Sequence, residues 1–124
     1  MNKQGSRQNY YHAQQSIKSE RENEYDIIFR ITRELKQAFL VRYEDYPKFV
    51  NALNKNRNLW TILASDLLQP GNQLPKELKA QLFYLGEFVQ DYSRRALKER
   101  LSISPLLDVN MSILRGLRNK DIDA

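Results

Sequence analysis

Apolar residues recur at intervals of three and four along most of the chain, which is the spacing of one face of an α-helix. Short polar or proline-containing segments separate four such stripes, and no segment alternates convincingly between apolar and polar residues. The pattern therefore predicts an all-α protein, a small bundle of about four helices with short loops. The stripes comprise Ile28, Ile31, Leu35, Ala38 and Phe39, then Phe49, Val50, Leu53, Leu59, Trp60, Leu63, Ala64 and Leu67, then Leu78, Leu82, Leu85, Val89, Tyr92 and Ala96, and finally Leu106, Leu107, Val109, Ile113, Leu114 and Leu117.

Short motifs mark the predicted helix ends. Ser19 followed by Glu22 forms a capping box, in which two side chains satisfy orphan amide donors, so the first helix is predicted to begin at Ser19. Prolines set the other ends, because proline fits a first helical turn and disfavours helical geometry in the residue before it. These ends are Pro47 and Pro75 in first turns, Gln69 before Pro70 at a stop, and Pro105 behind a Ser104 cap.

The length of 124 residues suits one domain. Residues 1–18 are mostly polar, so we expect a flexible N-terminal arm there. The helical domain is predicted over residues 19–118, with Gly116 near the end of its last helix. Residues 119–124 are expected to form a frayed tail.

Composition and charge narrow the class of protein. Hydrophobic residues make up 41% of the chain and charged residues 28%, which is typical of a globular protein. The chain has no cysteine, no apolar signal-peptide core and no run approaching the ~20 apolar residues of a spanning helix, so we expect a cytoplasmic protein without a membrane span. The net charge of +5 is divided as +2, +1 and +2 between residues 1–23, 24–69 and 70–124, and this spread argues against nucleic acid without excluding it.

The sequence offers little for catalysis. The sole histidine, His12, lies in the polar arm and is better explained as a solvated side chain than as a tuned acid or base. The sequence has no metal-ligand spacing and no glycine-rich phosphate loop. Carboxylates lie close to basic residues, as in the expected pair of Asp91 and Arg95, so a salt-bridged surface explains them better than a catalytic dyad. We therefore predict a protein that is not an enzyme and uses no cofactor.

Two residues of the second stripe are candidates for a structural or binding role. Trp60 is either a core anchor, which its place on the apolar face favours, or an interface hot spot. Arg57 lies one turn before Trp60. It is equally consistent with pairing to a carboxylate, such as that of Asp66 or Asp108, and with contacting a partner.

Three asparagines raise a similar choice. Asn72 follows Pro70 and Gly71, so turn formation explains it most simply. Asn110 instead lies between apolar residues on the last helix. If it is buried, it needs hydrogen-bond partners such as Asn56 or Arg57, because an unpaired buried amide costs ~1–3 kcal/mol.

The densest basic segment is SRRALKER, residues 93–100, which follows Tyr92. It is a candidate for phosphate contact, although the interleaved aromatic residues of a stacking platform are missing apart from that tyrosine. A solvated helix end is the favoured interpretation. The basic residues concerned are Arg94, Arg95, Lys98 and Arg100.

Three further motifs occur in a fixed order: NRNLW at residues 56–60, NQLPKELKAQLFYL at 72–85 and PLLDVNMSILRGL at 105–117. In this order and spacing they resemble the FlaF family, small bacterial proteins of flagellar biogenesis. The resemblance covers about residues 10–118, and Phe88 stands where the family pattern has a tryptophan. The matching positions are Asn56, Arg57, Leu59 and Trp60, then Asn72, Leu74, Pro75, Leu78, Gln81 and Leu82, then Leu107, Asp108, Asn110, Gly116 and Leu117.

The resemblance implies a function that composition does not. It implies a chaperone-like, non-catalytic regulator that binds flagellin and promotes its synthesis and export, with the regulator FlbT as a further partner. The alternative is a post-transcriptional regulator that binds flagellin messenger RNA directly. The candidate polar cluster, partner-binding or structural, is then Asn56, Arg57, Trp60, Gln81, Asp108 and Asn110.

Overall fold

The computed structural model describes the backbone of residues 5–123 and the side chains of residues 23–117. This part of the chain folds into four helices without a strand, which confirms the predicted all-α bundle. The helices are α1 (Gly5–Leu40), α2 (Tyr46–Leu67), α3 (Lys76–Glu99) and α4 (Ser104–Asp123).

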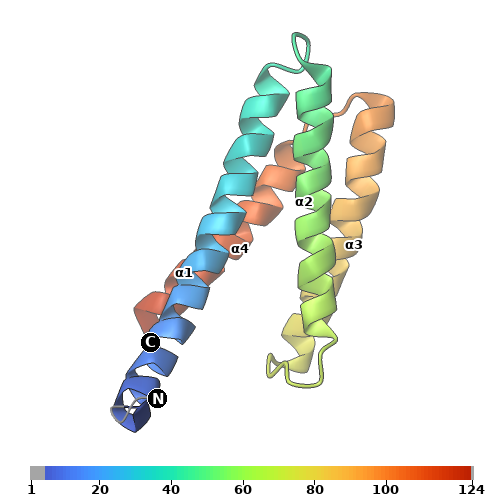
Figure 1. Cartoon of the computed structure of the whole chain (residues 1–124). Coiled ribbons are helices and arrows are strands. Elements are labelled where there is room, and N and C mark those ends of the chain that lie inside the picture. Colours follow the sequence, from blue (N-terminus) through green and yellow to red (C-terminus); the bar gives the residue numbers. More distant parts are fainter. Residues whose placement is uncertain (1–4, 124) are drawn as a thin grey trace.

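The helices form a bundle that opens at one end (Figure 1). Helix α2 packs against both α1 and α3, and α4 packs mainly against α1. The α1–α2 turn and the end of α3 lie together at the top of the view in Figure 1. Towards the bottom, the ribbons of α1 and α4 diverge from those of α2 and α3, and we call this the open end of the bundle and the opposite end the closed end.

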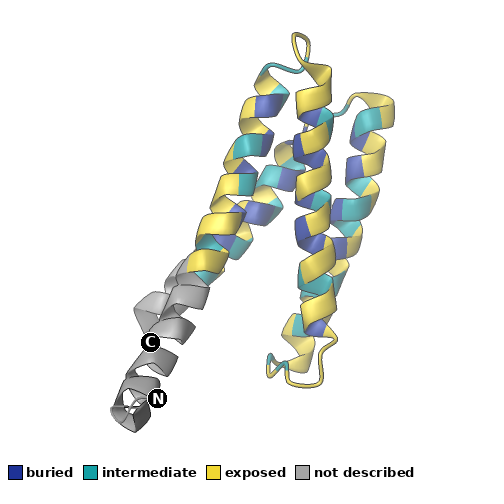
Figure 2. Ribbon diagram, in the orientation of Figure 1, coloured by how far each residue is buried: buried dark blue, intermediate teal, exposed yellow. Residues whose placement is uncertain are grey.

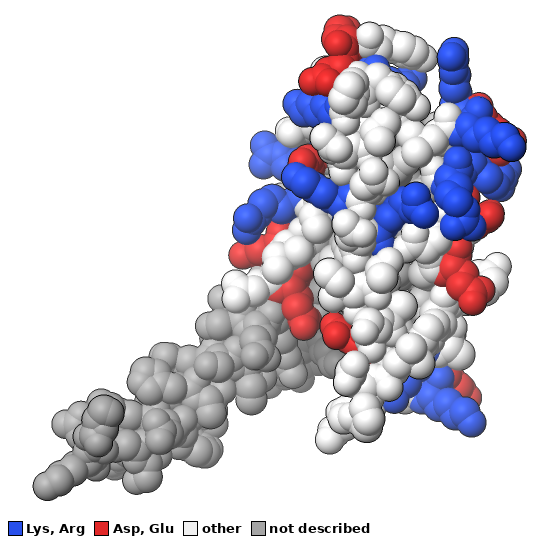
Figure 3. Space-filling model, turned by 45° about the vertical axis from the view of Figure 1, so that its right-hand side comes forward, with Lys and Arg blue, Asp and Glu red and all other residues white. Residues whose placement is uncertain are grey.

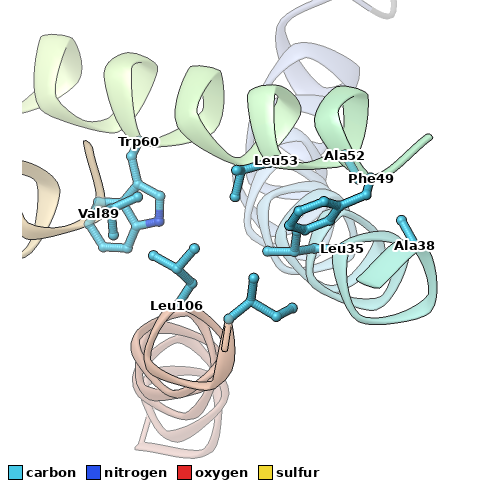
Figure 4. Close-up of a cluster of buried hydrophobic side chains, with 9 residues drawn as sticks. Leu35, Ala38, Phe49, Ala52, Leu53, Trp60, Val89 and Leu106 are labelled. Atoms are coloured by element: carbon cyan, nitrogen blue, oxygen red, sulfur yellow. The ribbon is translucent and has the colours of Figure 1, made fainter. Parts of the chain in front are cut away.

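The core lies where the predicted apolar stripes face one another (Figure 2). Leu35, Leu53, Val89 and Leu106, one from each helix, are 0% exposed. Figure 4 shows these side chains converging, with Trp60 of α2 beside Val89. Burial of this apolar surface holds all four helices together, at roughly 25 cal/mol for each Å² removed from water.

Local hydrogen bonds set the helix ends near the predicted prolines. Asp45 is the N-cap of α2, and its Oδ1 atom accepts the Lys48 backbone N–H at 3.2 Å. In the α2–α3 loop, Asn72 Oδ1 accepts the Leu74 backbone N–H at 3.0 Å and Asn72 Nδ2 donates to the Asp66 carbonyl at 3.1 Å. Asn72 therefore does the turn chemistry that the sequence predicted.

Two predicted helix ends are wrong. Helix α1 begins at Gly5, so its start at Ser19 is corrected. Helix α4 continues past Gly116 to Asp123, so the predicted end is also corrected. Neither the capping box nor a single glycine stops a helix, because interior serine and glycine cost only ~0.5–1 kcal/mol relative to alanine. The division into arm, domain and tail stays a prediction, since side chains of residues 1–22 and 118–124 lie outside the described residues.

Candidate functional site

A buried polar network links three helices around Asn110 of α4. The Trp60 indole Nε1 donates to Asn110 Oδ1 at 2.9 Å. Asn110 Nδ2 donates to Asn56 Oδ1 at 2.7 Å and to Thr32 Oγ1 at 3.0 Å. Thr32 Oγ1 donates in turn to the Ile28 carbonyl of α1 at 2.6 Å. The network thus joins α1, α2 and α4 inside the bundle.

This network is shielded from water. Asn56 and Asn110 are 0% exposed, Trp60 is 2% and Thr32 is 7%. The sequence predicted that a buried Asn110 needs partners, and Asn56 is one of them. Thr32 was missed, although a polar residue one turn after Ile28 inside an apolar stripe was a usable signal. The directional bonds fix how α4 rests on α1 and α2, because a displaced helix leaves buried polar groups unpaired.

Trp60 also holds α2 close to α3. A Cβ atom placed on Gly86 would lie 3.6 Å from Trp60 Cε3, so the indole lies directly over this glycine. Gly86 and Val89 are both buried on the face of α3 that meets α2. The expected core position of Trp60 is therefore what the structure has, and an edge of its side chain also lines the apolar groove described below.

Arg57 bonds to α3 rather than to a carboxylate. Its Nε atom donates to Gln90 Oε1 at 3.0 Å, and Gln90 Nε2 donates back to the Arg57 carbonyl at 2.9 Å. Gln90 Nε2 also donates to Thr61 Oγ1 at 3.2 Å. The suggested pairing of Arg57 with Asp66 or Asp108 is wrong, because its helical position directs it towards α3 while Asn56 faces α4.

Besides Arg57, two members of the predicted polar cluster lie outside the network. Asp108 is exposed on α4, and its backbone carbonyl accepts the Ser112 hydroxyl at 3.0 Å. Gln81 is exposed on α3, where it lines a shallow depression with Ala80 and Tyr84. The structure thus brings Asn56, Trp60 and Asn110 together and places Arg57 beside them.

An apolar groove runs between the diverging helix pairs at the open end of the bundle. Its cavity volume is about 370 Å³, and all four helices contribute to its walls. Ile27 of α1 and Ile62 of α2 remain 47% and 60% exposed. The side chains lining it are Glu24, Ile27, Ile28, Leu59, Trp60, Ile62, Leu63, Ala64, Asp66, Leu67, Asn72, Leu74, Leu82, Ile113 and Leu117.

Charge is sparse in the apolar groove. Only Glu24 and Asp66 carry charge among its lining residues, and Asn72 adds an amide. The largest exposed apolar side chains in it lie on two different helices, so the surface is assembled by the fold. A concave, mostly apolar surface with few polar groups is typical of a binding site.

The predicted basic patch divides into two parts at the end of α3. Arg94 pairs with Asp91 at 3.6 Å and Arg95 Nε with Glu99 Oε2 at 3.0 Å. The expected pair of Asp91 and Arg95 is therefore wrong, since Arg95 pairs in the opposite direction along the helix. Lys98 and Arg100 instead line a separate cavity. Figure 3 shows basic side chains gathered towards this end of the molecule.

The described part of the chain shows neither a group of metal-ligating side chains nor a membrane-spanning helix. No group of three or more His, Cys, Asp and Glu side chains there could hold a metal ion. No helix there is both long and apolar enough to cross a bilayer. His12 lies outside the residues whose side chains are described.

The fold and the site define a small all-α protein with a polar network in its core and an open apolar groove. Comparison with protein families matches residues 6–117 to the family described as flagellar protein FlaF. The chain therefore belongs to the FlaF family of flagellar proteins, as its motifs indicated, which is consistent with a role in flagellar biogenesis. No curated protein and no solved structure matches the chain.

Proposed function

We propose that this protein binds flagellin without catalysis and promotes its synthesis and export in the cytoplasm, in a chaperone-like way. The observation that carries the proposal is the apolar groove at the open end of a bundle from a flagellar protein family. An amphipathic helix of flagellin is the proposed occupant. The regulator FlbT is proposed as a further partner.

The groove has the shape and chemistry of a helix-binding surface. Amphipathic helices bind such grooves through apolar side chains spaced three and four residues apart. Ile27 and Ile62 present exposed apolar surface from opposite helix pairs. Covering them with a partner helix removes this surface from water, and the carboxylate of Asp66 at the groove supplies a polar contact that orients the partner.

Substitution in the groove tests this proposal. We expect Ile27→Ser combined with Ile62→Ser to raise the dissociation constant for flagellin by about tenfold or more, seen as lost co-elution on size exclusion. Central apolar contacts dominate such interfaces. Binding of the unmodified protein should survive high salt, since apolar burial is not screened. Both substituted residues are exposed, so the free energy of unfolding should change by less than about 0.5 kcal/mol for each.

A matched control uses exposed leucines outside the groove. Leu40 ends α1 and Leu68 follows α2, and they are 67% and 71% exposed. Leu40→Ser combined with Leu68→Ser removes similar exposed apolar surface, one residue at the end of α1 and one just after α2, and neither residue lines the groove. Equal flagellin binding by both double variants would refute the groove as the flagellin site.

A further inference from the structure

A second cavity lies at the closed end of the bundle, away from the apolar groove. The end of α1, the α1–α2 turn and the last turn of α3 enclose a volume of about 510 Å³. Four aromatic side chains, one of them the buried Phe49, and three basic side chains line it, together with Ala96, Leu97 and Leu101. We name it the aromatic–basic cavity, and its distinctive residues are Phe39, Tyr43, Tyr46, Arg42, Lys98 and Arg100.

The cavity supplies the aromatic residues that were missing beside the basic segment in the sequence. Tyr43 and Tyr46 are 83% and 50% exposed, although both line the cavity. They lie more than fifty positions before Lys98 and Arg100 in the chain. Only the fold brings these two sets of side chains to one place.

Arg42 holds one of these tyrosines in position. Its guanidinium carbon lies 4.4 Å from the centre of the Tyr43 ring and 3.8 Å from that of Phe39. The Nη1 atom donates to the Phe39 carbonyl at 2.8 Å, and Nη2 donates to the Tyr43 hydroxyl at 3.2 Å. Arg42 therefore covers one face of the Tyr43 ring, while the high exposure of the side chain leaves the other face open for stacking.

The two basic residues from α3 keep their charges available. Neither Lys98 nor Arg100 forms an ion pair within the described residues, whereas Arg94 and Arg95 are paired. Arg100 is the C-cap of α3 with φ 55° and ψ 46°, a left-handed conformation that favours glycine. An arginine at this strained position keeps a cation at the cavity at a cost in backbone energy.

No acidic side chain among the described residues lines the cavity, and Glu99, between Lys98 and Arg100 in the chain, pairs with Arg95. Glu44 and Asp45 belong to the α1–α2 turn, but neither lines the cavity. The Asp45 carboxylate is directed at the start of α2, where Oδ1 accepts the Lys48 backbone N–H. The lining charges are therefore all positive.

We propose that this cavity binds a short segment of single-stranded RNA, with a base stacked on Tyr43 and phosphates contacted by Lys98 and Arg100. Proteins that bind single strands combine an aromatic stacking surface with basic groups that follow the backbone, and this cavity has both. An acidic peptide would use the charges but not the open ring face. The Tyr43 and Tyr46 hydroxyls supply hydrogen-bonding groups for a ribose 2′-hydroxyl, which favours RNA over DNA. The inference does not depend on flagellin binding.

Fluorescence anisotropy with a labelled oligouridine and the full-length protein tests the proposal. We expect Tyr43→Ala to weaken binding by about tenfold, because stacking is lost. Tyr84→Ala is the matched control, since Tyr84 is 71% exposed on α3 outside this cavity, and it should leave affinity unchanged. Lys98→Gln should reduce the slope of log affinity against log salt by about one.

Arg100→Gly separates binding from folding. Glycine adopts the left-handed conformation without strain, so this variant should raise the melting temperature. It also removes the guanidinium, so it should weaken RNA binding. Undetectable oligouridine binding would overturn the proposal. So would equal losses with Tyr43→Ala and Tyr84→Ala, equal affinity for free uridine monophosphate or for the matching DNA, or a preference for an acidic peptide. The double groove variant Ile27→Ser, Ile62→Ser should keep its RNA affinity.

Discussion

Asn110 uses both ends of its amide in the core. Its oxygen accepts from Trp60, and its nitrogen donates to Asn56 and Thr32. No aliphatic residue of similar size provides both functions, so the polar side chain is required once Trp60 and Asn56 are buried around it. The sequence alone indicated that a buried Asn110 needs partners, but Asn56 and Arg57 were equal candidates. They are adjacent on α2 and face different helices, which only the packing reveals.

We predict that Asn110→Ala destabilises the fold by about 3 kcal/mol, because it leaves the Trp60 N–H and the Asn56 amide buried with fewer partners and opens a cavity. Urea unfolding followed by circular dichroism measures the change. Ser112→Ala is the control on the same helix, because Ser112 is exposed and its loss should cost less than about 0.5 kcal/mol. A similar small effect at Asn110 would show that the network adds no stability.

At the scale of the helices, α2 is the element that organises the bundle. One face carries Asn56 and Trp60 towards α4, and the adjoining position carries Arg57 towards α3. The number of helices and their apolar faces could be predicted, because period and burial are properties of each segment by itself. The partner of Arg57 could not be predicted, because Gln90 is distant in the sequence and a neutral amide is not an expected partner for an arginine.

Helix ends were the weaker part of the sequence prediction. The ends marked by prolines lie close to their predicted positions, because proline changes backbone geometry directly, although Ser104 is the first residue of α4 rather than its cap. The helix ends predicted at Ser19 and near Gly116 were wrong, because a serine or a glycine is also tolerated in the interior of a helix. A local motif therefore limits a helix reliably only where it removes a hydrogen bond or forbids a backbone conformation.

We predict that Arg57 and Gln90 stabilise the α2–α3 contact jointly. Arg57→Ala should lower the melting temperature and cost about 1.5 kcal/mol, the lower end of the range for a hydrogen bond with a charged donor, because the pair is only part-buried. Gln90→Ala should cost at least as much, because it also removes bonds to the Arg57 carbonyl and Thr61. A double-mutant cycle from thermal unfolding should give a coupling of roughly 0.5–1 kcal/mol. Additive losses would show that the two side chains act independently, whereas an unchanged melting temperature with lost flagellin binding would assign Arg57 to a partner instead.

The whole molecule has two ends of different chemistry. At the open end, the apolar groove exposes aliphatic side chains that include Ile27 and Ile62. At the closed end, the aromatic–basic cavity exposes Tyr43, Lys98 and Arg100. Neither surface was visible in the sequence, because each is built from helices that are separated in the chain and meet only on folding. The sequence located the basic residues of one surface, and the fold supplied its aromatic residues.

The two surfaces share no lining residue, so we predict that their ligands bind independently. Two sites are coupled only if the protein has two states and each ligand binds one of them more tightly. The core between these ends is held by the hydrogen bonds of Asn110, so we expect one state. Titration of oligouridine into the protein saturated with flagellin should change the RNA dissociation constant by less than about twofold, which is ~0.4 kcal/mol of coupling. Tyr43→Ala should keep flagellin co-elution, as the groove variant keeps RNA. A tenfold loss of RNA affinity with flagellin bound would mean that the bundle has two states, in which opening of the groove alters the opposite end.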